Sequence, residues 1–158
     1  MGKNRKEQAV ESTLLANYEK YYRLALSYSR NEADACDIVQ EAAYKAILKC
    51  ESLKNIEYAD TWIYRIVINE AYTFLKKRRA EENLDEIEEK NISAEDAYEN
   101  LDLKQALERL DEKDRTIVVL RFFEDRRLDE IAEILDMNLN TVKSRLYRVM
   151  DRLKLALD

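Results

Sequence analysis

A cluster of basic and hydrogen-bonding side chains lies near the C-terminal end of the sequence. Residues 141–154 hold five Lys or Arg side chains and one acid, in a chain whose net charge is −6. On a helical wheel with about 100° per residue, one face of this segment is apolar. The apolar positions are Val142, Leu146, Val149, Met150 and Leu153. The remaining positions combine cations with a serine and a tyrosine, which are groups that contact phosphates and base edges in nucleic acids.

A shorter amphipathic segment precedes this basic helix. Its apolar positions, spaced i, i+3, i+4 and i+7, are Leu128, Ile131, Ala132 and Leu135. Asn138 and Asn140 lie between the two segments, where Asn tolerates a left-handed backbone and caps a following helix. A basic face alone is most often only a solvated face. Two helices joined by a tight turn favour a helix-turn-helix, which places its second helix in the DNA major groove.

A second candidate site lies on a helix that we expect to begin at Asp60 or Thr61 and to run to about Arg79. One strip of this otherwise apolar helix has an aromatic ring, two cations, two hydrogen-bonding groups and no acid. The strip consists of Trp62, Arg65, Asn69, Thr73 and Lys76. Stacking aromatics combined with cations suit single-stranded nucleic acid. The alternative is a half-buried Trp beside a solvated edge.

The rest of the chain also has helical periodicity. The first expected stripe holds Leu14, Tyr18, Tyr21, Tyr22 and Ala25. The second begins near Asp34 and holds Ala35, Ile38, Val39, Ala42 and Ala46. Two more helices are expected near residues 102–110 and 112–124. The chain has no Pro and one Gly, which favours long helices and leaves few turns for strands. We therefore predict an all-α protein.

Charge divides the 158 residues into three parts. Residues 1–80 have a net charge of +3, residues 81–100 of −8 and residues 101–158 of −1. The middle part is too acidic and too poor in apolar residues to form a core. We predict two small helical domains joined by an acidic linker, the second being a four-helix domain that contains the helix-turn-helix.

Composition argues against several classes of protein. The chain has no His, and its two Cys residues, Cys36 and Cys50, lie about 21 Å apart if one helix joins them. A disulfide, a zinc site and a His general base are therefore not expected, and one Gly cannot form a phosphate-binding loop. We predict no enzyme activity, cofactor, metal or small-molecule substrate. No apolar run reaches the roughly 20 residues of a membrane span, so we expect a cytoplasmic protein.

Four segments in this order resemble the bacterial sigma factors of the extracytoplasmic-function class. Residues 34–47 resemble region 2.2, the helix that docks on the beta-prime clamp helices of RNA polymerase. Residues 61–69 and the following FLKKRR resemble regions 2.3 and 2.4, which open and read the −10 promoter element. Residues 106–135 resemble region 4.1 and the first helix of region 4.2, and residues 140–153 resemble the −35 recognition helix. The resemblance covers about residues 14–157.

The resemblance implies three groups of site residues. Those that would face the clamp helices are Asp37, Gln40 and Glu41. Those that would contact the −10 region are Trp62, Arg65 and Asn69, followed by Lys76, Lys77, Arg78 and Arg79 on duplex phosphates. Those that would contact the −35 element are Lys143, Ser144, Tyr147 and Arg148 at base edges, with Arg145 and Arg152 on phosphates. Phosphate contacts give affinity, whereas base contacts give specificity.

The implied function is transcription initiation: the chain binds core RNA polymerase, through the clamp helices and the beta flap, and directs it to specific promoter DNA. Members of this family are commonly held inactive by an anti-sigma factor, often anchored in the membrane. The alternative is a stand-alone helix-turn-helix regulator that binds duplex DNA as a dimer. A purely structural helical adaptor would leave the basic helix unexplained.

Four features depart from the usual family pattern. Asp136 and Asn140 stand where Gly is common, and Cys36 replaces a common acid on the docking helix. The loop between the second and third helices, at about residues 50–60, lacks the Gly and Phe often found there. That loop helps to hold a flipped-out base in the family, so the −10 preference of this chain is left open.

Overall fold

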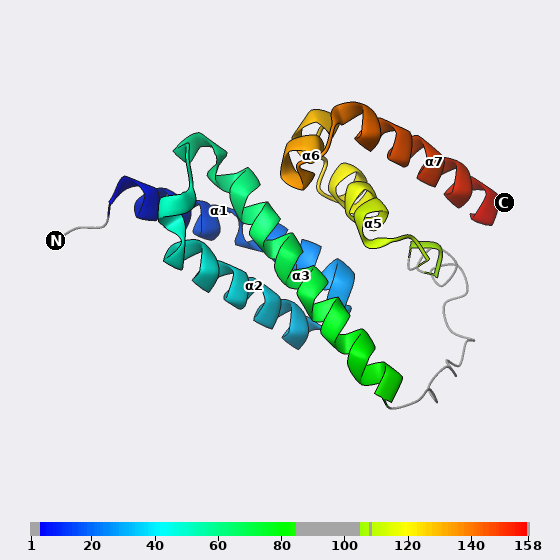
Figure 1. Cartoon of the computed structure of the whole chain (residues 1–158), viewed down its shortest axis with the longest axis horizontal. Helices are drawn as coiled ribbons and strands as arrows, with labels where there is room; N and C mark the ends of the chain where they lie inside the picture. Colours follow the sequence, from blue (N-terminus) through cyan, green and yellow to red (C-terminus); the bar gives the residue numbers. More distant parts are fainter. Residues whose placement is uncertain (1–3, 85–104, 108, 158) are drawn as a thin grey trace. The chain divides into compact units, whose positions relative to one another are not determined.

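The computed structural model describes residues 4–84, 105–107 and 109–157. These residues form helices joined by turns, with no strand among them (Figure 1), and the all-α prediction is confirmed. Contacts between residues divide the chain into two compact units, Met1–Arg78 and Arg79–Asp158. Most of the acidic segment lies outside the described residues. In the described part of the chain, no helix is both long enough and apolar enough to cross a bilayer.

Helix α1 (Arg5–Ser29) has well-defined ends. The side chain of Asn4 caps its start by accepting a hydrogen bond from the amide of Glu7 at 2.8 Å. At its end Arg30 adopts a left-handed conformation (φ 58°), and its amide donates to the carbonyl of Leu26. A residue without glycine's freedom therefore ends the helix, since the only Gly of this chain is at position 2.

Helix α2 (Glu32–Leu48) confirms its predicted stripe, because all five expected apolar positions are buried. The cap is Asn31, whose side chain accepts from the amide of Asp34 at 2.9 Å. The helix therefore starts two residues before the expected position. Of the α1 stripe, four positions are buried or half-buried, but Tyr18 is 40% exposed.

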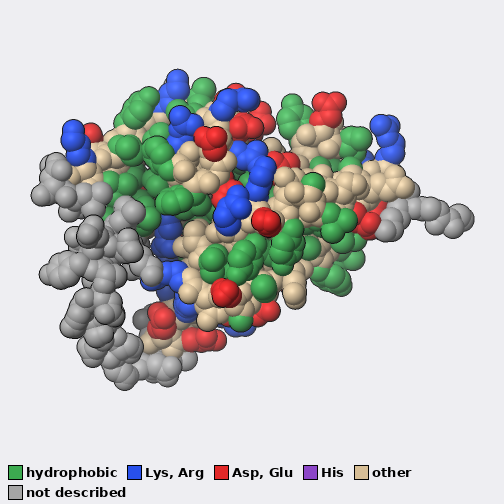
Figure 2. Space-filling view, turned by 180° about the vertical axis from the view of Figure 1, so that it is seen from behind, with side chains coloured by type: hydrophobic (Ala, Val, Ile, Leu, Met, Phe, Trp, Pro, Cys, Tyr) green, Lys and Arg blue, Asp and Glu red, His purple; other side chains and the backbone are tan. Residues whose placement is uncertain are grey.

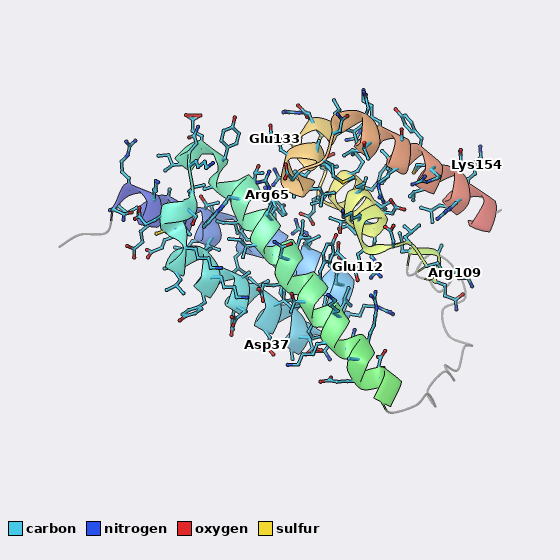
Figure 3. The ribbon with its side chains drawn as sticks, viewed as in Figure 1. Asp37, Arg65, Arg109, Glu112, Glu133 and Lys154 are labelled. Carbon is cyan, nitrogen blue, oxygen red and sulfur yellow. The ribbon has the colours of Figure 1, made fainter. Side chains whose placement is uncertain are left out.

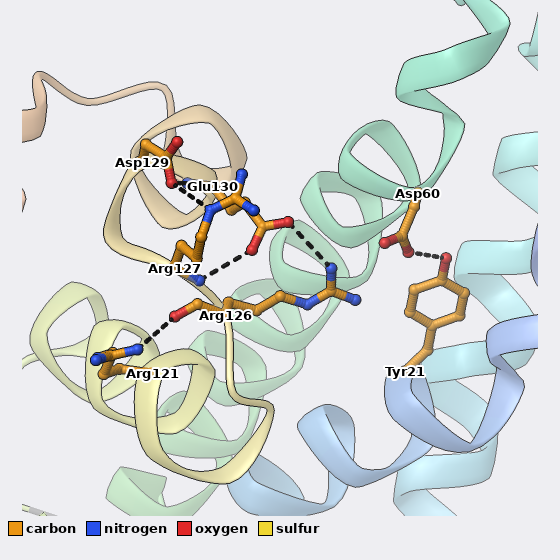
Figure 4. Close-up of polar contacts among 7 residues, drawn as sticks. All are labelled: Tyr21, Asp60, Arg121, Arg126, Arg127, Asp129 and Glu130. Carbon is orange, nitrogen blue, oxygen red and sulfur yellow. Dashed lines mark hydrogen bonds and ion pairs between the residues drawn. The ribbon is translucent and has the colours of Figure 1, made fainter.

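Helix α3 (Ala59–Leu84) differs from the prediction at both ends. It continues directly from a short 3-10 turn, η2 (Ile56–Tyr58), so neither Asp60 nor Thr61 caps it. Asp60 instead accepts a hydrogen bond from the hydroxyl of Tyr21 at 2.6 Å (Figure 4). At the other end the helix extends five residues beyond Arg79, because Ala and Glu favour helix and no Pro or Gly interrupts them.

The first unit forms one core from these three helices and the segment before α3. Besides the α2 stripe, its buried residues include Val10, Leu14, Tyr21, Leu24 and Tyr28 of α1, and Ile63, Tyr64, Val67, Ile68, Ala71 and Leu75 of α3. Two edge-to-face tyrosine pairs join α1 to α3: the ring centroids lie 5.1 Å apart in Tyr21–Tyr64 and 5.8 Å in Tyr28–Tyr72. Cys36 and Cys50 are free thiols, as expected.

In the second unit, helix α5 (Glu112–Val118) passes into a π-helical turn, η4 (Val119–Phe123). Asp111 caps α5 by accepting from the amide of Asp114 at 2.8 Å. The expected helix over residues 112–124 is therefore present but widens in its last turn. The helix expected near 102–110 lies partly outside the described residues; a helical bond from the amide of Arg109 to the carbonyl of Gln105 belongs to its described part.

A polar network holds the connection from η4 to the next helix (Figure 4). The guanidinium of Arg121 donates to the carbonyl of Arg126 at 3.3 Å. The carboxylate of Glu130 accepts from the amide of Arg127 at 2.9 Å and lies 3.7 Å from the guanidinium of Arg126. One carboxylate thereby caps the start of α6 (Leu128–Leu135) and fixes the chain that leads into it.

The turn between α6 and α7 (Leu139–Leu157) corrects one expectation. Its left-handed residue is Asp136 (φ 55°), not Asn138 or Asn140. Asn138 caps α7 by accepting from the amide of Asn140 at 2.8 Å, and Asn140 lies inside the first turn of α7. The left-handed backbone at position 136 requires a residue that tolerates positive φ, which Asp does.

Candidate nucleic-acid interface

Helix α7 has a buried apolar face and an exposed basic face. Val142, Leu146 and Val149 are buried, as predicted, and Leu153 is half-buried. Met150 is 40% exposed, so its place on the inner face was predicted wrongly. The exposed predicted contact residues are Lys143, Ser144, Tyr147, Arg148 and Arg152. They share one side of a helix whose other side packs on α5 and α6, so they are presented together to solvent.

Arg145 differs from the other predicted contact residues on α7. Its Nη1 donates to Asp114 Oδ1 at 2.8 Å and lies 3.5 Å from Asp111 Oδ2. The hydrogen bond to Asp114 is the main reason why the pKa of the Arg145 guanidinium is raised. The side chain is half-buried and is already bound within the domain.

The strip on α3 is exposed along most of its length. Arg65, Asn69 and Lys76 are exposed, and Trp62 is half-buried. Thr73 is also exposed, but its hydroxyl donates to the carbonyl of Asn69 at 2.9 Å. One side of α3 therefore carries an aromatic ring, two cations and the exposed amide side chain of Asn69. Further basic residues follow in the next turn of the helix. The buried positions of α3 lie on its other sides.

Arg78 is the exception among the four basic residues at the end of the strip. Its guanidinium donates to the carbonyl of Ser29 at 3.1 Å, lies 4.0 Å from the carboxylate of Asp34, and lies over the ring of Phe74 at 5.1 Å. Arg78 therefore connects α3 to the junction of α1 and α2. The other three residues, Lys76, Lys77 and Arg79, are exposed.

The outward face of α2 carries the three residues predicted to dock on polymerase. Asp37, Gln40 and Glu41 are exposed, and Figure 3 shows Asp37 projecting from this helix. Two apolar side chains on the same face were missed by the sequence analysis: Tyr44 is 62% exposed and Leu48 is 65% exposed. Their positions outside the buried stripe, at helical spacing from Gln40 and Glu41, are the signal that could have found them.

Beside this face, α2 is joined to α3 by an ion pair between Lys45 and Glu70. The hydrogen bond to Glu70 is the largest cause of the raised pKa of Lys45, and the charges of Glu70 and Glu41 raise it further. The pair adds a polar contact between α2 and α3 beside their shared core.

The second unit has an apolar groove that was also missed. Its volume is about 410 Å³, and its lining residues are Leu107, Val118, Phe122, Phe123, Met150, Asp151, Leu153 and Lys154. Phe122 is 52% exposed and Phe123 60% exposed. The π-helical turn places these adjacent rings at the surface, and Figure 2 shows apolar side chains gathered over this unit at the upper left. The exposed apolar rings make this groove a candidate interaction site.

Comparison with known protein families covers both units. The family model for "Sigma-70 region 2" matches residues 14–81, and the model for "Sigma-70, region 4" matches residues 100–153. RNA polymerase sigma factor SigV of Bacillus subtilis is 41% identical over 160 residues, which cover 99% of this chain and 96% of that protein. The extracytoplasmic-function sigma factor SigW of the same organism is 30% identical, over 86% of this chain and 82% of that protein.

The chain belongs to the sigma-70 family, in its extracytoplasmic-function class. Among solved structures it is similar to the sigma factor RpoE of Bartonella quintana, bound there to the anti-sigma factor NepR. The TM-score is 0.71 at 27% sequence identity, over 93% of this chain and 95% of that one. This sigma factor directs RNA polymerase to promoters. A stand-alone regulator is not favoured, because the region 2 match includes both the α2 face and the α3 strip.

Proposed function

We propose a division of labour among four surfaces of this sigma factor. The α2 face and the groove of the second unit bind core RNA polymerase, the α3 strip holds the opened −10 region, and α7 reads the −35 element. The observation that carries the proposal is the basic side of α7. Five hydrogen-bonding or cationic side chains are exposed there, on a helix whose opposite face is anchored by Val142, Leu146 and Val149.

For the −35 element, Lys143, Ser144, Tyr147 and Arg148 are the base-edge contacts. Arg and Lys favour the acceptor groups of guanine, and a tyrosine ring can contact a thymine methyl group. Arg152 lies one turn after Arg148 and supplies a phosphate contact, which strengthens binding to all sequences alike.

For the −10 element, the strip on α3 suits a strand whose bases are unstacked. The Trp62 ring is a stacking surface, Arg65 is an exposed cation, and the exposed Asn69 amide can donate to and accept from one base. Lys76, Lys77 and Arg79 follow along the helix and contact duplex phosphates next to the opened region.

Two surfaces suit the polymerase. The α2 face has apolar Tyr44 and Leu48 next to the polar Asp37, Gln40 and Glu41, which is the mixture found in protein interfaces. The groove of the second unit offers an apolar floor for a helix of the beta flap, with Asp151 and Lys154 at its polar edge.

Regulation by an anti-sigma factor and action in the cytoplasm are part of the same proposal. The related RpoE of Bartonella quintana was solved with an anti-sigma factor bound. The exposed apolar surfaces named above are those that such a partner would cover to prevent polymerase binding. The acidic segment between the units, with a net charge of −8 over residues 81–100, repels duplex DNA and favours DNA binding only within the polymerase complex.

Mixing the purified chain with bacterial core polymerase tests the function. We expect a 1:1 complex that starts transcription at a specific promoter selected from random DNA. The result against the proposal is tight binding of the chain alone to duplex DNA as a dimer, without a complex with core polymerase at moderate salt.

The docking face has its own matched test. Leu48→Ser should weaken core polymerase binding by roughly tenfold, because an exposed apolar anchor at an interface contributes about 1 kcal/mol or more. Leu15→Ser is the control, since Leu15 is 82% exposed on α1 of the same unit but lies outside the α2 face. Equal affinities for the two variants would remove the α2 face from the interface.

A further inference from the structure

Arg145 lies at the border between the buried and the basic faces of α7. The side-chain carboxylate of Asp114 that accepts its hydrogen bond at 2.8 Å is only 5% exposed. The Arg145 side chain itself is 26% exposed, whereas Arg148 and Arg152 on the neighbouring turns are exposed. Arg145 is therefore a cation like Arg148 and Arg152, but its guanidinium points toward Asp114 within the second unit.

The partners of Arg145 belong to the start of another helix. Asp111 Oδ1 caps α5 by accepting from the amide of Asp114, while Asp111 Oδ2 lies 3.5 Å from Arg145 Nη1. One guanidinium therefore bridges the capping residue of α5 and a buried acid in its first turn. The two residues are 31 positions apart in sequence, so their contact joins α7 to the start of α5.

We propose that Arg145 is a positioning residue, which sets the −35 specificity by holding α7 on the N-terminus of α5, and that it does not contact DNA phosphates. The inference rests on the proposed role of α7 at the −35 element. It replaces the sequence-based expectation that Arg145 and Arg152 have the same task.

The electrostatics of Asp114 favour this assignment. A carboxylate that is almost fully buried needs a paired cation, since breaking a buried pair leaves an uncompensated charge. Arg145 Nη1 is held by Asp114 and Asp111, so a phosphate could bind only the remaining donors of a guanidinium whose side chain is 26% exposed. Arg148 and Arg152 are exposed on α7 and are the better placed phosphate contacts.

Holoenzymes made with Arg145→Gln, Asp114→Asn and the double variant test the proposal. The probe is the promoter fragment that the wild-type holoenzyme selects from a pool randomised at the −35 element. Three quantities are measured: affinity as a function of salt, the −35 sequences that each variant selects, and the melting temperature. Arg152→Ala is the phosphate-contact reference, and Lys45→Gln, which breaks an ion pair in the first unit, is the control for selection.

The two single variants and the double variant should all relax −35 selection by roughly threefold or more. The loss of selectivity in the double variant should not exceed that of either single variant, as expected for coupled residues. The slope of log affinity against log salt should stay at the wild-type value in the Arg145 variant, whereas Arg152→Ala should reduce it by about 0.9. The double variant leaves no unpaired buried charge, so it supplies the salt slope even where a single variant does not fold.

Three results would overturn the proposal. The first is a salt slope lowered by about 0.9 in the double variant, with Asp114→Asn binding as tightly as wild type, which assigns Arg145 to a phosphate. The second is a lower melting temperature with −35 selection unchanged, which makes the pair purely structural. The third concerns a holoenzyme made with Arg148→Ala. If it selects the same −35 sequences as wild type, α7 does not read the −35 element, and the proposed function is overturned as well.

Discussion

The hydroxyl of Tyr21 donates a hydrogen bond to Asp60 Oδ1 at 2.6 Å, which ties the middle of α1 to the first turn of α3 (Figure 4). The Tyr21 side chain is fully buried, and its ring packs edge-on against Tyr64 one turn further along α3. Trp62 and Arg65 follow Asp60 closely. The bond therefore fixes the start of the helix that carries the proposed −10 contacts.

Removing that hydroxyl should destabilise the protein. Tyr21→Phe keeps the ring but deletes the donor, so we expect a loss of about 1.5–3 kcal/mol in the free energy of unfolding, as for a hydrogen bond to a charged group. Denaturant titration measures the loss. Tyr18→Phe, which alters a 40% exposed tyrosine of the same helix, should change stability by less than about 0.5 kcal/mol. Equal stabilities for both variants would contradict a structural role for the bond.

Asn69 should matter only when the promoter is opened. Asn69→Ala removes an exposed side chain, so folding and core polymerase binding should be unchanged, while open-complex formation on duplex promoters should fall. On a template already mismatched across the −10 region the defect should shrink, because the opening cost of a few kcal/mol is already met. Permanganate reactivity of unpaired thymines measures the open fraction on both templates.

Trp62→Ala is the stricter variant, because the half-buried ring also packs in the first unit. Its melting temperature must be compared with its open-complex yield. If Asn69→Ala unfolds the unit, or acts equally on duplex and pre-melted templates, the strip is structural and the contact with the flipped base moves to residues 50–60.

Two arginines of α7 should have separable effects. Arg148→Ala should cost about 1–3 kcal/mol and relax preference at one base pair. Arg152→Ala should weaken binding to all promoters alike and reduce the salt dependence. Holoenzyme binding to a set of single-base −35 variants measures both. Should both substitutions act equally on every sequence, α7 would not be the reading helix.

The groove should contribute to polymerase binding through its exposed rings. Phe123→Ser should lower the affinity for core polymerase by about 1–3 kcal/mol, because a buried aromatic anchor is lost from the interface. Since Phe123 is 60% exposed in the free chain, its loss should have little effect on stability. Lys154→Ser, at the edge of the same groove (Figure 3), is the control and should have a small effect, as rim residues do. Affinity is read from equilibrium titration of labelled polymerase. If Phe123→Ser loses no more affinity for core polymerase than Lys154→Ser, the groove does not bind polymerase.

Periodicity predicted most of what is buried in the regular helices, with Tyr18 and Met150 as exceptions. The α2 stripe and the inner trio Val142, Leu146 and Val149 were correct, because an amphipathic helix of ordinary geometry must bury its apolar face. The exposed strip of α3 could also be read from spacing, since its members recur at helical intervals among apolar residues. The family could be recognised from four ordered segments.

The misses have specific physical causes. The π-helical turn shifts the register of the helix that contains it, so Phe122 and Phe123 both reach the surface although an α-helical wheel does not predict this. The left-handed residue of the turn is Asp136 and not an Asn; because Asp also tolerates positive φ, residue type alone did not distinguish the positions. The partner of Arg145 lies 31 residues away, and a contact at that separation is determined by packing and not by local spacing.

The division of labour between α3 and α7 is the central claim, and site-specific photo-crosslinking tests it most directly. A photoreactive side chain is placed at Asn69 or at Tyr147, both exposed, and the holoenzyme is irradiated on promoter DNA. We predict that position 69 crosslinks to a single strand within the opened −10 region and position 147 to duplex DNA at the −35 element, each only when core polymerase is present. Crosslinks of both positions to the same duplex segment, formed equally well without polymerase, would contradict the account.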